Sequence, residues 1–210
     1  MIPVKICGIT NIEDARCAVE AGASAVGFIF YEESPRAVSP DSAANIADVL
    51  PSQMKKVGVF VNHHREFIEK TFSQVPLDLI QLHGGETAEF CSGFSVPVIK
   101  VLRVKHGASM SLLNGYDVHA LLLDTWKNGQ YGGTGKTFDW SLLKDRTEAR
   151  PIILSGGLKP ENVLTAVETV RPAAIDVNSG VEVRPGIKDH DKIRSLFREI
   201  EDTHSTGFHF

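Results

Sequence analysis

Two side chains at the ends of short apolar runs have the chemical types needed for proton transfer. Cys7 ends the run Val4–Cys7, and Asp124 ends the run ALLLD at residues 120–124. A carboxyl group in such a place is partly desolvated, which raises its pKa and suits a general acid. A thiolate beside an anion-binding rim can serve as the base. An acid and a base facing each other across one pocket predict proton shuttling within a substrate, as in an isomerisation.

The alternative for each cysteine is that a buried free thiol packs as a small apolar residue. We expect this for Cys17 and Cys91, because each falls within a predicted helix. The three cysteines are odd in number and far apart, and they form no C-x-x-C pair. This argues against a disulfide framework and indicates a reducing compartment, so a cytoplasmic location is expected.

Eight short, nearly continuous apolar runs are typical of strands that are buried on both faces. They lie at Val4–Cys7, Ala25–Phe30, Lys56–Val61, Leu77–Leu82, Val98–Leu102, Ala120–Asp124, Ile152–Ser155 and Ala174–Asn178. Helical patterns alternate with them at Asn11–Ala21, Pro40–Leu50, His64–Phe72, Thr87–Phe94, Trp140–Lys144, Pro160–Val170 and Asp189–Glu201, with a short helix possible within 106–117. Strict alternation predicts one parallel sheet that closes into a (β/α)8 TIM barrel with eight parallel strands. A doubly wound open sheet is the alternative.

Length and composition fit a single domain over residues 1–210, in which the tail at 202–210 has no predicted role. Hydrophobic residues make up 42% of the chain and charged residues 23%, as in ordinary globular proteins. A net charge of -4 provides no basic footprint for nucleic acid. No apolar run approaches the ~20 residues of a membrane helix. We therefore expect no nucleic acid and no membrane as partner, and both a monomer and a homodimer stay open.

In a parallel barrel, the C-terminal ends of the strands and the loops after them form the active face. Polar residues follow each predicted strand in turn: Cys7, Arg36, Asn62, Gln81 with His83, Arg103, Asp124, Ser155, and Asp176 with Asn178. They are scattered along most of the chain, so only the predicted fold would bring them together on one rim.

Glycine-rich loops follow the seventh and eighth predicted strands. Gly156 and Gly157 lie between a strand and a helix that begins near Pro160, and Ser179 and Gly180 follow the last strand. Glycines let the backbone approach an anion closely and point N–H groups at it. These two loops are the usual phosphate site of the fold, so we expect phosphate binding here. The alternative is that the glycines serve tight turns only.

The stretch GGTGKT at residues 132–137 ends like a P-loop. A P-loop also needs a glycine five residues before Gly135, where this chain has Gln130. The spacing therefore argues against an NTPase, and a long loop over Thr125–Phe138 that closes over substrate fits better.

Arg36 follows Ser34-Pro35 in a predicted loop. An arginine fork suits a carboxylate or a phosphate, although a solvated surface arginine is the alternative. His63, His64 and His83 match no common zinc spacing, so no metal site is expected.

Many short motifs make this chain similar to the phosphoribosylanthranilate isomerases of tryptophan biosynthesis. They are KICGIT (5–10), SPR (34–36), VGVFVN (57–62), QLHG (81–84), LLLD (121–124), GGTGKTFDW (132–140), LSGGLKPENV (154–163), DVNSGVE (176–182) and PGIKD (185–189). They occur in the family's order from residue 5 to residue 189, and only the tail lies outside them. The resemblance is therefore specific.

The resemblance implies an Amadori rearrangement of N-(5′-phosphoribosyl)anthranilate to 1-(o-carboxyphenylamino)-1-deoxyribulose 5-phosphate. It implies that Asp124 is the general acid that opens the furanose ring and that Cys7 is the general base that removes the C2′ proton. It further implies that Arg36 pairs with the anthranilate carboxylate, and that His83 and Asp176 are substrate-binding residues. Because protons move within one substrate, neither a cofactor nor a metal is required.

Two other functions stay open at this point, and a third is excluded by spacing. Indole-glycerol-phosphate synthase shares the phosphate loops, but it would use a lysine acid and an extra N-terminal helical segment, whereas the first strand here begins by residue 4. A non-catalytic phosphosugar-binding barrel would not require Cys7. An NTPase already fails on the P-loop spacing.

Overall fold

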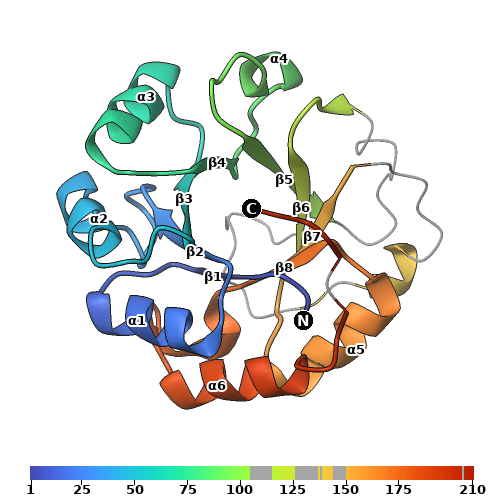
Figure 1. Cartoon of the computed structure of the whole chain (residues 1–210). Coiled ribbons are helices and arrows are strands. Elements are labelled where there is room, and N and C mark those ends of the chain that lie inside the picture. Colours follow the sequence, from blue (N-terminus) through green and yellow to red (C-terminus); the bar gives the residue numbers. More distant parts are fainter. Residues whose placement is uncertain (105–114, 126–136, 138, 144–149, 205) are drawn as a thin grey trace.

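The computed structural model describes residues 1–104, 115–125, 137, 139–143, 150–204 and 206–210. Eight parallel strands form a closed barrel in chain order, and β8 pairs with β1 (Figure 1). The strands are β1 (Val4–Cys7), β2 (Ala25–Ile29), β3 (Lys55–Phe60), β4 (Leu79–Leu82), β5 (Val98–Val104), β6 (Ala120–Thr125), β7 (Ile152–Leu154) and β8 (Ala174–Val177). The predicted TIM barrel is therefore confirmed, and the open-sheet alternative is wrong.

Helices surround the barrel (Figure 1). They are α1 (Ile12–Ala21), α2 (Pro40–Ala47), α3 (Arg65–Gln74), α4 (Ala88–Cys91), the 3-10 helix η2 (Trp140–Leu143), α5 (Pro160–Val170) and α6 (His190–Glu199). Each predicted helix in the described residues exists, but the fourth is only one turn long and the one at Trp140 is a 3-10 turn. The predicted short helix within 106–117, most of the predicted loop at 125–138 and nearly all of GGTGKT lie outside the described residues.

Local sequence explains where the first helices begin and end. The side chain of Asn11 caps α1 by accepting a hydrogen bond from Asp14 N, and Gly22 ends this helix in a left-handed conformation with φ 96°. Ser39 caps α2 in the same way, directly before Pro40 at the first helical position. These signals place each helix between two strands and fix the loops that lead onto the rim.

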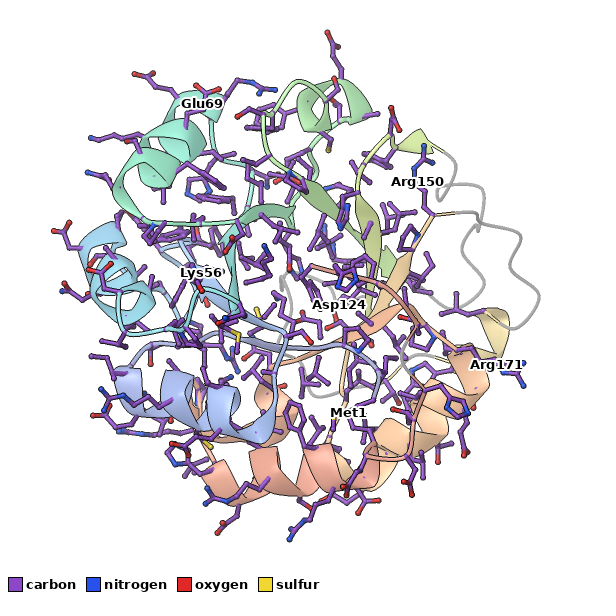
Figure 2. All side chains as sticks on the ribbon, in the orientation of Figure 1. Met1, Lys56, Glu69, Asp124, Arg150 and Arg171 are labelled. Atoms are coloured by element: carbon purple, nitrogen blue, oxygen red, sulfur yellow. The ribbon has the colours of Figure 1, made fainter. Side chains whose placement is uncertain are left out.

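Alternate residues of every strand face two different layers. One set, which includes Ile6, Phe28 and Leu121, packs against buried residues of the helices such as Ala15 and Leu196. The other set faces the inside of the barrel. The apolar members of this inner set form one buried cluster: Ala25, Val57, Leu79, Ile99, Val101, Ala120, Leu122, Ile153 and Ala174. Figure 2 shows Asp124 inside the ring, whereas Glu69 projects outward from α3.

The C-terminal tail covers the floor of the barrel, at the N-terminal ends of the strands. Figure 1 shows the tail crossing the middle of the ring of strands. Phe210 is buried against the interior apolar cluster, and Phe208 packs on it with ring centroids 5.2 Å apart. Thr206 Oγ1 donates to Ala173 O at 2.6 Å, and His119 Nε2 lies 3.0 Å from His209 O. The tail, for which the sequence predicted no role, therefore packs as part of the core.

Candidate active site

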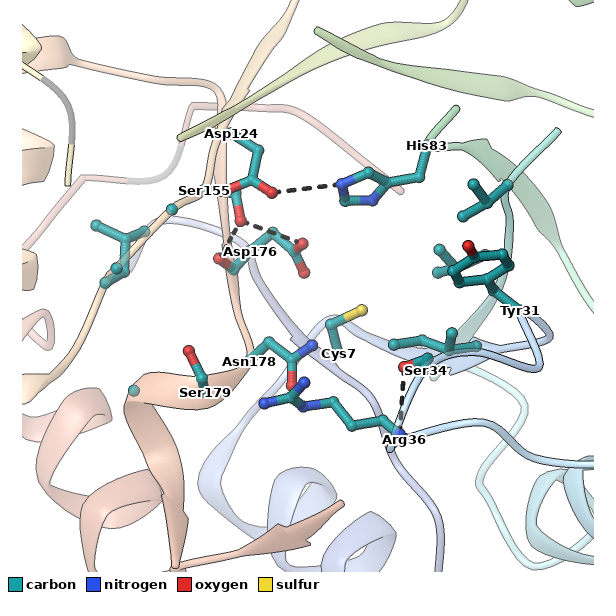
Figure 3. Close-up of a pocket in the computed structure, with 17 residues that line it drawn as sticks. Cys7, Tyr31, Ser34, Arg36, His83, Asp124, Ser155, Asp176, Asn178 and Ser179 are labelled. Atoms are coloured by element: carbon teal, nitrogen blue, oxygen red, sulfur yellow. Dashed lines mark hydrogen bonds and ion pairs between the residues drawn. The ribbon is translucent and has the colours of Figure 1, made fainter. Parts of the chain in front are cut away.

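A hollow at the C-terminal end of the barrel collects most of the predicted site residues (Figure 3). The empty space within it, including the open solvent at its mouth, is about 650 Å³. All nine predicted site residues line it: Cys7, Arg36, His83, Asp124, Gly156, Gly157, Asp176, Ser179 and Gly180. The other rim candidates Asn62, Gln81 and Arg103 are not among its lining residues. Strand ends that are far apart in the sequence thus converge as the barrel prediction required.

Cys7 presents its thiol to this hollow from the end of β1 (Figure 3). The side chain is buried beside Ile29 and Val59, which close one side of the hollow. Burial raises the pKa of the Cys7 thiol; Lys5 opposes that effect and Asp176 adds to it. The pKa of the free thiol is therefore set by its burial and by the charges that surround it. Cys17 and Cys91 are also free and buried, and neither lines the hollow.

Asp124 stands at the end of β6 and is only 4% exposed. Its Oδ1 accepts a hydrogen bond from Thr125 N at 2.7 Å, and its Oδ2 lies 3.3 Å from His83 Nε2 (Figure 3). The geometry of this contact is not that of a hydrogen bond. His83 Nε2 is therefore a buried polar atom without a hydrogen-bond partner among the described residues. On the other side of the ring, His83 Nδ1 lies 3.2 Å from Gln81 Nε2. Asp124 and His83 thus form one polar wall of the hollow.

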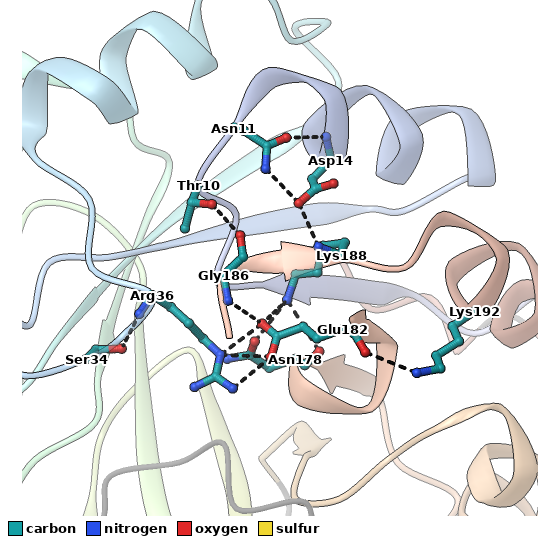
Figure 4. Close-up of polar contacts among 10 residues, drawn as sticks. All are labelled: Thr10, Asn11, Asp14, Ser34, Arg36, Asn178, Glu182, Gly186, Lys188 and Lys192. Carbon is teal, nitrogen blue, oxygen red and sulfur yellow. Dashed lines mark hydrogen bonds and ion pairs between the residues drawn. The ribbon is translucent and has the colours of Figure 1, made fainter. Parts of the chain in front are cut away.

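Arg36 lies in the loop after β2 and forms a fork with Glu182 (Figure 4). Its Nε and Nη2 donate to the Glu182 carboxylate at 2.9 and 2.8 Å. Glu182 also accepts from Lys188 Nζ at 3.0 Å. Burial opposes the charge on Glu182, but the hydrogen bonds from Arg36 and the attraction of Lys188 outweigh it and hold the pKa of Glu182 below its usual value. The guanidinium is therefore oriented before any ligand arrives, and Nη1 has no partner among the described residues.

A two-stranded hairpin supplies Glu182 and Lys188. It consists of β9 (Glu182–Arg184) and β10 (Ile187–Lys188) and follows β8. Thr10 Oγ1 donates to Gly186 O at 2.5 Å, and Lys188 N donates to Asp14 Oδ2 at 2.8 Å, so α1 and the loop before it hold the hairpin against the rim (Figure 4). This hairpin was not among the elements predicted from the sequence.

The loops after β7 and β8 approach each other at the hollow. Gly156 and Gly157 both have positive φ, at 90° and 69°, a conformation that favours glycine. A Cβ at Gly156 would collide with Thr125, and a Cβ at Gly180 would collide with Leu158 O. Both positions therefore need glycine, because neighbouring atoms lie too close for a Cβ. Ser179 begins a short 3-10 helix, η3 (Ser179–Val181), beside these glycines.

Asp176 lies at the interior of β8, below the rim. Its Oδ1 accepts from Lys5 Nζ at 2.7 Å, and Ser155 Oγ donates to its backbone oxygen at 3.1 Å. Sequence patterns predicted a role for Asp176 but none for Lys5. The alternation of side chains along a strand indicates that Lys5 lies near the site, because Lys5 is two residues before Cys7 and must face the same side of β1.

Two negative findings apply to the described residues. They contain no group of three or more His, Cys, Asp or Glu side chains that could hold a metal ion. They also contain no helix that is long and apolar enough to cross a membrane.

Comparisons with known proteins point to one family. The family model described as N-(5′-phosphoribosyl)anthranilate (PRA) isomerase matches residues 4–199. The N-(5′-phosphoribosyl)anthranilate isomerase of Geobacter sulfurreducens is 50% identical over 201 residues, which cover 96% of this chain and 99% of that protein.

Solved structures agree with the sequence matches. One shows monomers generated from the dimeric phosphoribosylanthranilate isomerase of Thermotoga maritima. It has a TM-score of 0.85 and 45% identity, and the match covers 96% of this chain and 99% of that one. Another is phosphoribosyl anthranilate isomerase in complex with reduced 1-(o-carboxyphenylamino)-1-deoxyribulose 5-phosphate. It has the same TM-score, identity and coverage.

Proposed function

Since this chain belongs to the N-(5′-phosphoribosyl)anthranilate isomerase family, we propose that it catalyses the Amadori rearrangement of N-(5′-phosphoribosyl)anthranilate to 1-(o-carboxyphenylamino)-1-deoxyribulose 5-phosphate, a step of tryptophan biosynthesis. The observation that carries this proposal is the shared hollow. It places a buried thiol, a buried carboxyl, an arginine fork and two glycine loops around one space. These are the groups that an acid–base isomerisation of an anionic phosphosugar requires.

Asp124 acts as the general acid in this proposal. It protonates the ring oxygen of the ribose, and the furanose opens to an imine. Its burial beneath the rim removes water from the proton transfer. The neighbouring His83, whose Nε2 lies 3.3 Å from Asp124 Oδ2 and has no hydrogen-bond partner among the described residues, binds the substrate beside the acid.

Cys7 acts as the general base in the next step. Its thiolate removes the C2′ proton of the imine, and the resulting enolamine tautomerises to the ketone. Each well-placed acid or base contributes about 10²–10⁴ in rate. Both proton transfers stay within one substrate, so this chemistry needs neither a metal nor a redox cofactor.

The two anionic ends of the substrate have separate partners. The backbone N–H groups around Gly156, Gly157, Ser179 and Gly180 hold the phosphate, because the glycines allow an anion to come close to the backbone. Arg36 pairs with the anthranilate carboxylate through the guanidinium edge that Glu182 does not occupy. Asp176 then lies between these two ends and binds the ribose.

Several wider expectations belong to the same proposal. The enzyme acts in the cytoplasm, which agrees with three free buried cysteines. Residues 1–210 form one domain. The enzyme works without nucleic acid, as a monomer or a homodimer, and sedimentation at working concentration distinguishes the two states. A related enzyme from Thermotoga maritima is described as dimeric.

Turnover of freshly generated phosphoribosylanthranilate tests the proposed function. The loss of anthranilate fluorescence is followed with purified protein, with and without EDTA. Rapid loss that EDTA does not change supports a metal-free isomerase. No loss, with binding of a phosphate-containing product analogue intact, would favour a non-catalytic phosphosugar-binding barrel. Release of carbon dioxide from the isomerised product would instead indicate an indole-glycerol-phosphate synthase.

A further inference from the structure

A lysine is completely buried in the barrel beneath the proposed base. Lys5 has no solvent exposure, and its Nζ lies 2.7 Å from Asp176 Oδ1. Lysine is almost never fully buried unless it is paired, and a buried ion pair is weak evidence for stability alone. Lys5 does not line the substrate hollow, whereas Cys7 and Asp176 do. Lys5 therefore has a position from which it acts on the thiol and not on the substrate directly.

Gly27 shows how close the ammonium lies to the thiol. Gly27 is the partner of Cys7 in the register between β1 and β2. A Cβ added at Gly27 would come within 2.9 Å of Cys7 Sγ and within 3.1 Å of Lys5 Nζ. Cys7 Sγ and Lys5 Nζ are therefore at most about 6 Å apart, which is the sum of these two distances. A glycine at this position leaves the space that both groups occupy.

Other charged and titratable groups also lie near Cys7, and they too influence the pKa of its thiol. Lys188 contacts the site from β10, but its ammonium already pairs with Glu182 at 3.0 Å. Arg36 is held by the same carboxylate. Asp124 and His83 face the hollow from β6 and β4. Lys5 differs from these groups in its position. It is a fully buried cation that lies on β1, two residues from Cys7 and on the same face of the strand.

The pKa directions agree with this geometry. Burial lowers the pKa of Lys5, but the Asp176 carboxylate and Cys7 outweigh that effect and hold the pKa above its usual value. Lys5 therefore stays charged next to the thiol. Burial raises the pKa of Cys7, and Lys5 is the largest opposing influence.

We propose that Lys5 is a positioning residue of the isomerisation: its ammonium is the counter-ion of the Cys7 thiolate, and Asp176 keeps that ammonium in place. This inference rests on the proposed role of Cys7 as the base. During the step, the C2′ proton moves to Cys7 Sγ and the C–H electron pair stays with the substrate. Lys5 keeps its own protons throughout.

The pH dependence of Cys7 alkylation tests this proposal. The full chain is used with Cys17→Ala and Cys91→Ala, so that Cys7 is the one remaining thiol. Iodoacetamide modification is measured by mass spectrometry between about pH 6 and pH 11, a range that spans ordinary thiol values. Lys5→Met should raise the midpoint by about one pH unit or more, and should slow alkylation about tenfold below it. Asp176→Asn should move the midpoint in the opposite direction.

A second comparison covers the outcome in which Lys5→Met alone does not fold. Asp176→Asn is compared with the double variant Lys5→Met/Asp176→Asn, which leaves no buried charge unpaired. The double variant should have the higher midpoint. Midpoints that do not depend on Lys5 in either comparison would overturn the proposal, even if kcat fell. Alkylation needs no turnover, so the result stands apart from whether phosphoribosylanthranilate is the substrate.

Discussion

Removal of the Phe210 side chain tests whether the tail is part of the barrel. Phe210 is 7% exposed and closes the barrel floor against the interior apolar cluster. Phe→Ala in a protein core usually costs about 3–5 kcal/mol of unfolding free energy, through lost burial and the cavity that remains. Phe210 lies at a chain end, where the backbone can relax, so we expect a cost of about 2–4 kcal/mol for Phe210→Ala.

Thermal and denaturant unfolding measure this cost. For a chain of this length, each kcal/mol lowers Tm by about 2–4 °C, which gives a drop of roughly 4–16 °C. The adjacent His209→Ala is the matched control. The side chain of His209 is exposed, and only its backbone oxygen contacts His119. The control should change the unfolding free energy by less than about 0.5 kcal/mol.

Turnover at low temperature completes the test. The floor and the active rim are at opposite ends of the barrel, so Phe210→Ala should keep near-normal kcat where it is folded. Equal stability of Phe210→Ala and His209→Ala would refute the packing role of the tail. A large loss of kcat with unchanged stability would refute the separation of floor and rim.

Three further predictions concern the glycine loop at Gly180, the guanidinium of Arg36 and the buried carboxylate of Glu86. Gly180→Ala should raise the substrate KM at least about tenfold, because its Cβ would collide with a backbone oxygen of the neighbouring phosphate loop; an unchanged KM contradicts phosphate binding there. Arg36→Lys should raise KM similarly, since a lysine cannot form the fork; steady-state kinetics that match the wild type would contradict the carboxylate contact. Burial opposes the charge on Glu86, but its pair with Lys100 and its backbone hydrogen bonds hold its pKa below the usual value. The charged Glu86 therefore stabilises the fold above its unfolded pKa of about 4.3, and this stability is lost as the pH falls through the lower folded value. Denaturant unfolding should show that Glu86→Gln costs about 3–5 kcal/mol at pH 7 and flattens the acid dependence; an unflattened profile would assign the acid loss to other carboxylates.

The barrel could be predicted because its strands are buried on both faces and its helices carry clear start signals. Continuous apolar runs mark such strands, and Asn11 and Ser39 cap the helices that follow two of them. Closure of the sheet then determines which residues share the rim. For this reason Cys7 and Asp124, which are far apart in sequence, could be assigned to one pocket.

The parts that the sequence did not predict depend on contacts between distant segments. Lys5 looks like an ordinary polar residue until its partner Asp176 is brought beside it by the pairing of β1 with β8. Glu182 and Lys188 acquire their roles only when the β9–β10 hairpin folds back over the rim. The tail carries Phe208 and Phe210, but the sequence around them does not indicate that they pack against the floor of the barrel.

The most direct test of the account is the kcat of Cys7→Ser and Asp124→Asn, measured beside Cys17→Ala as a control for buried thiols. The two site variants should each lose about 100-fold or more in kcat with an unchanged circular dichroism spectrum, because each removes a proton-transfer group. Cys17→Ala should keep near-normal turnover, because Cys17 does not line the hollow. Near-normal turnover by either site variant would contradict the assignment of Cys7 as base and Asp124 as acid.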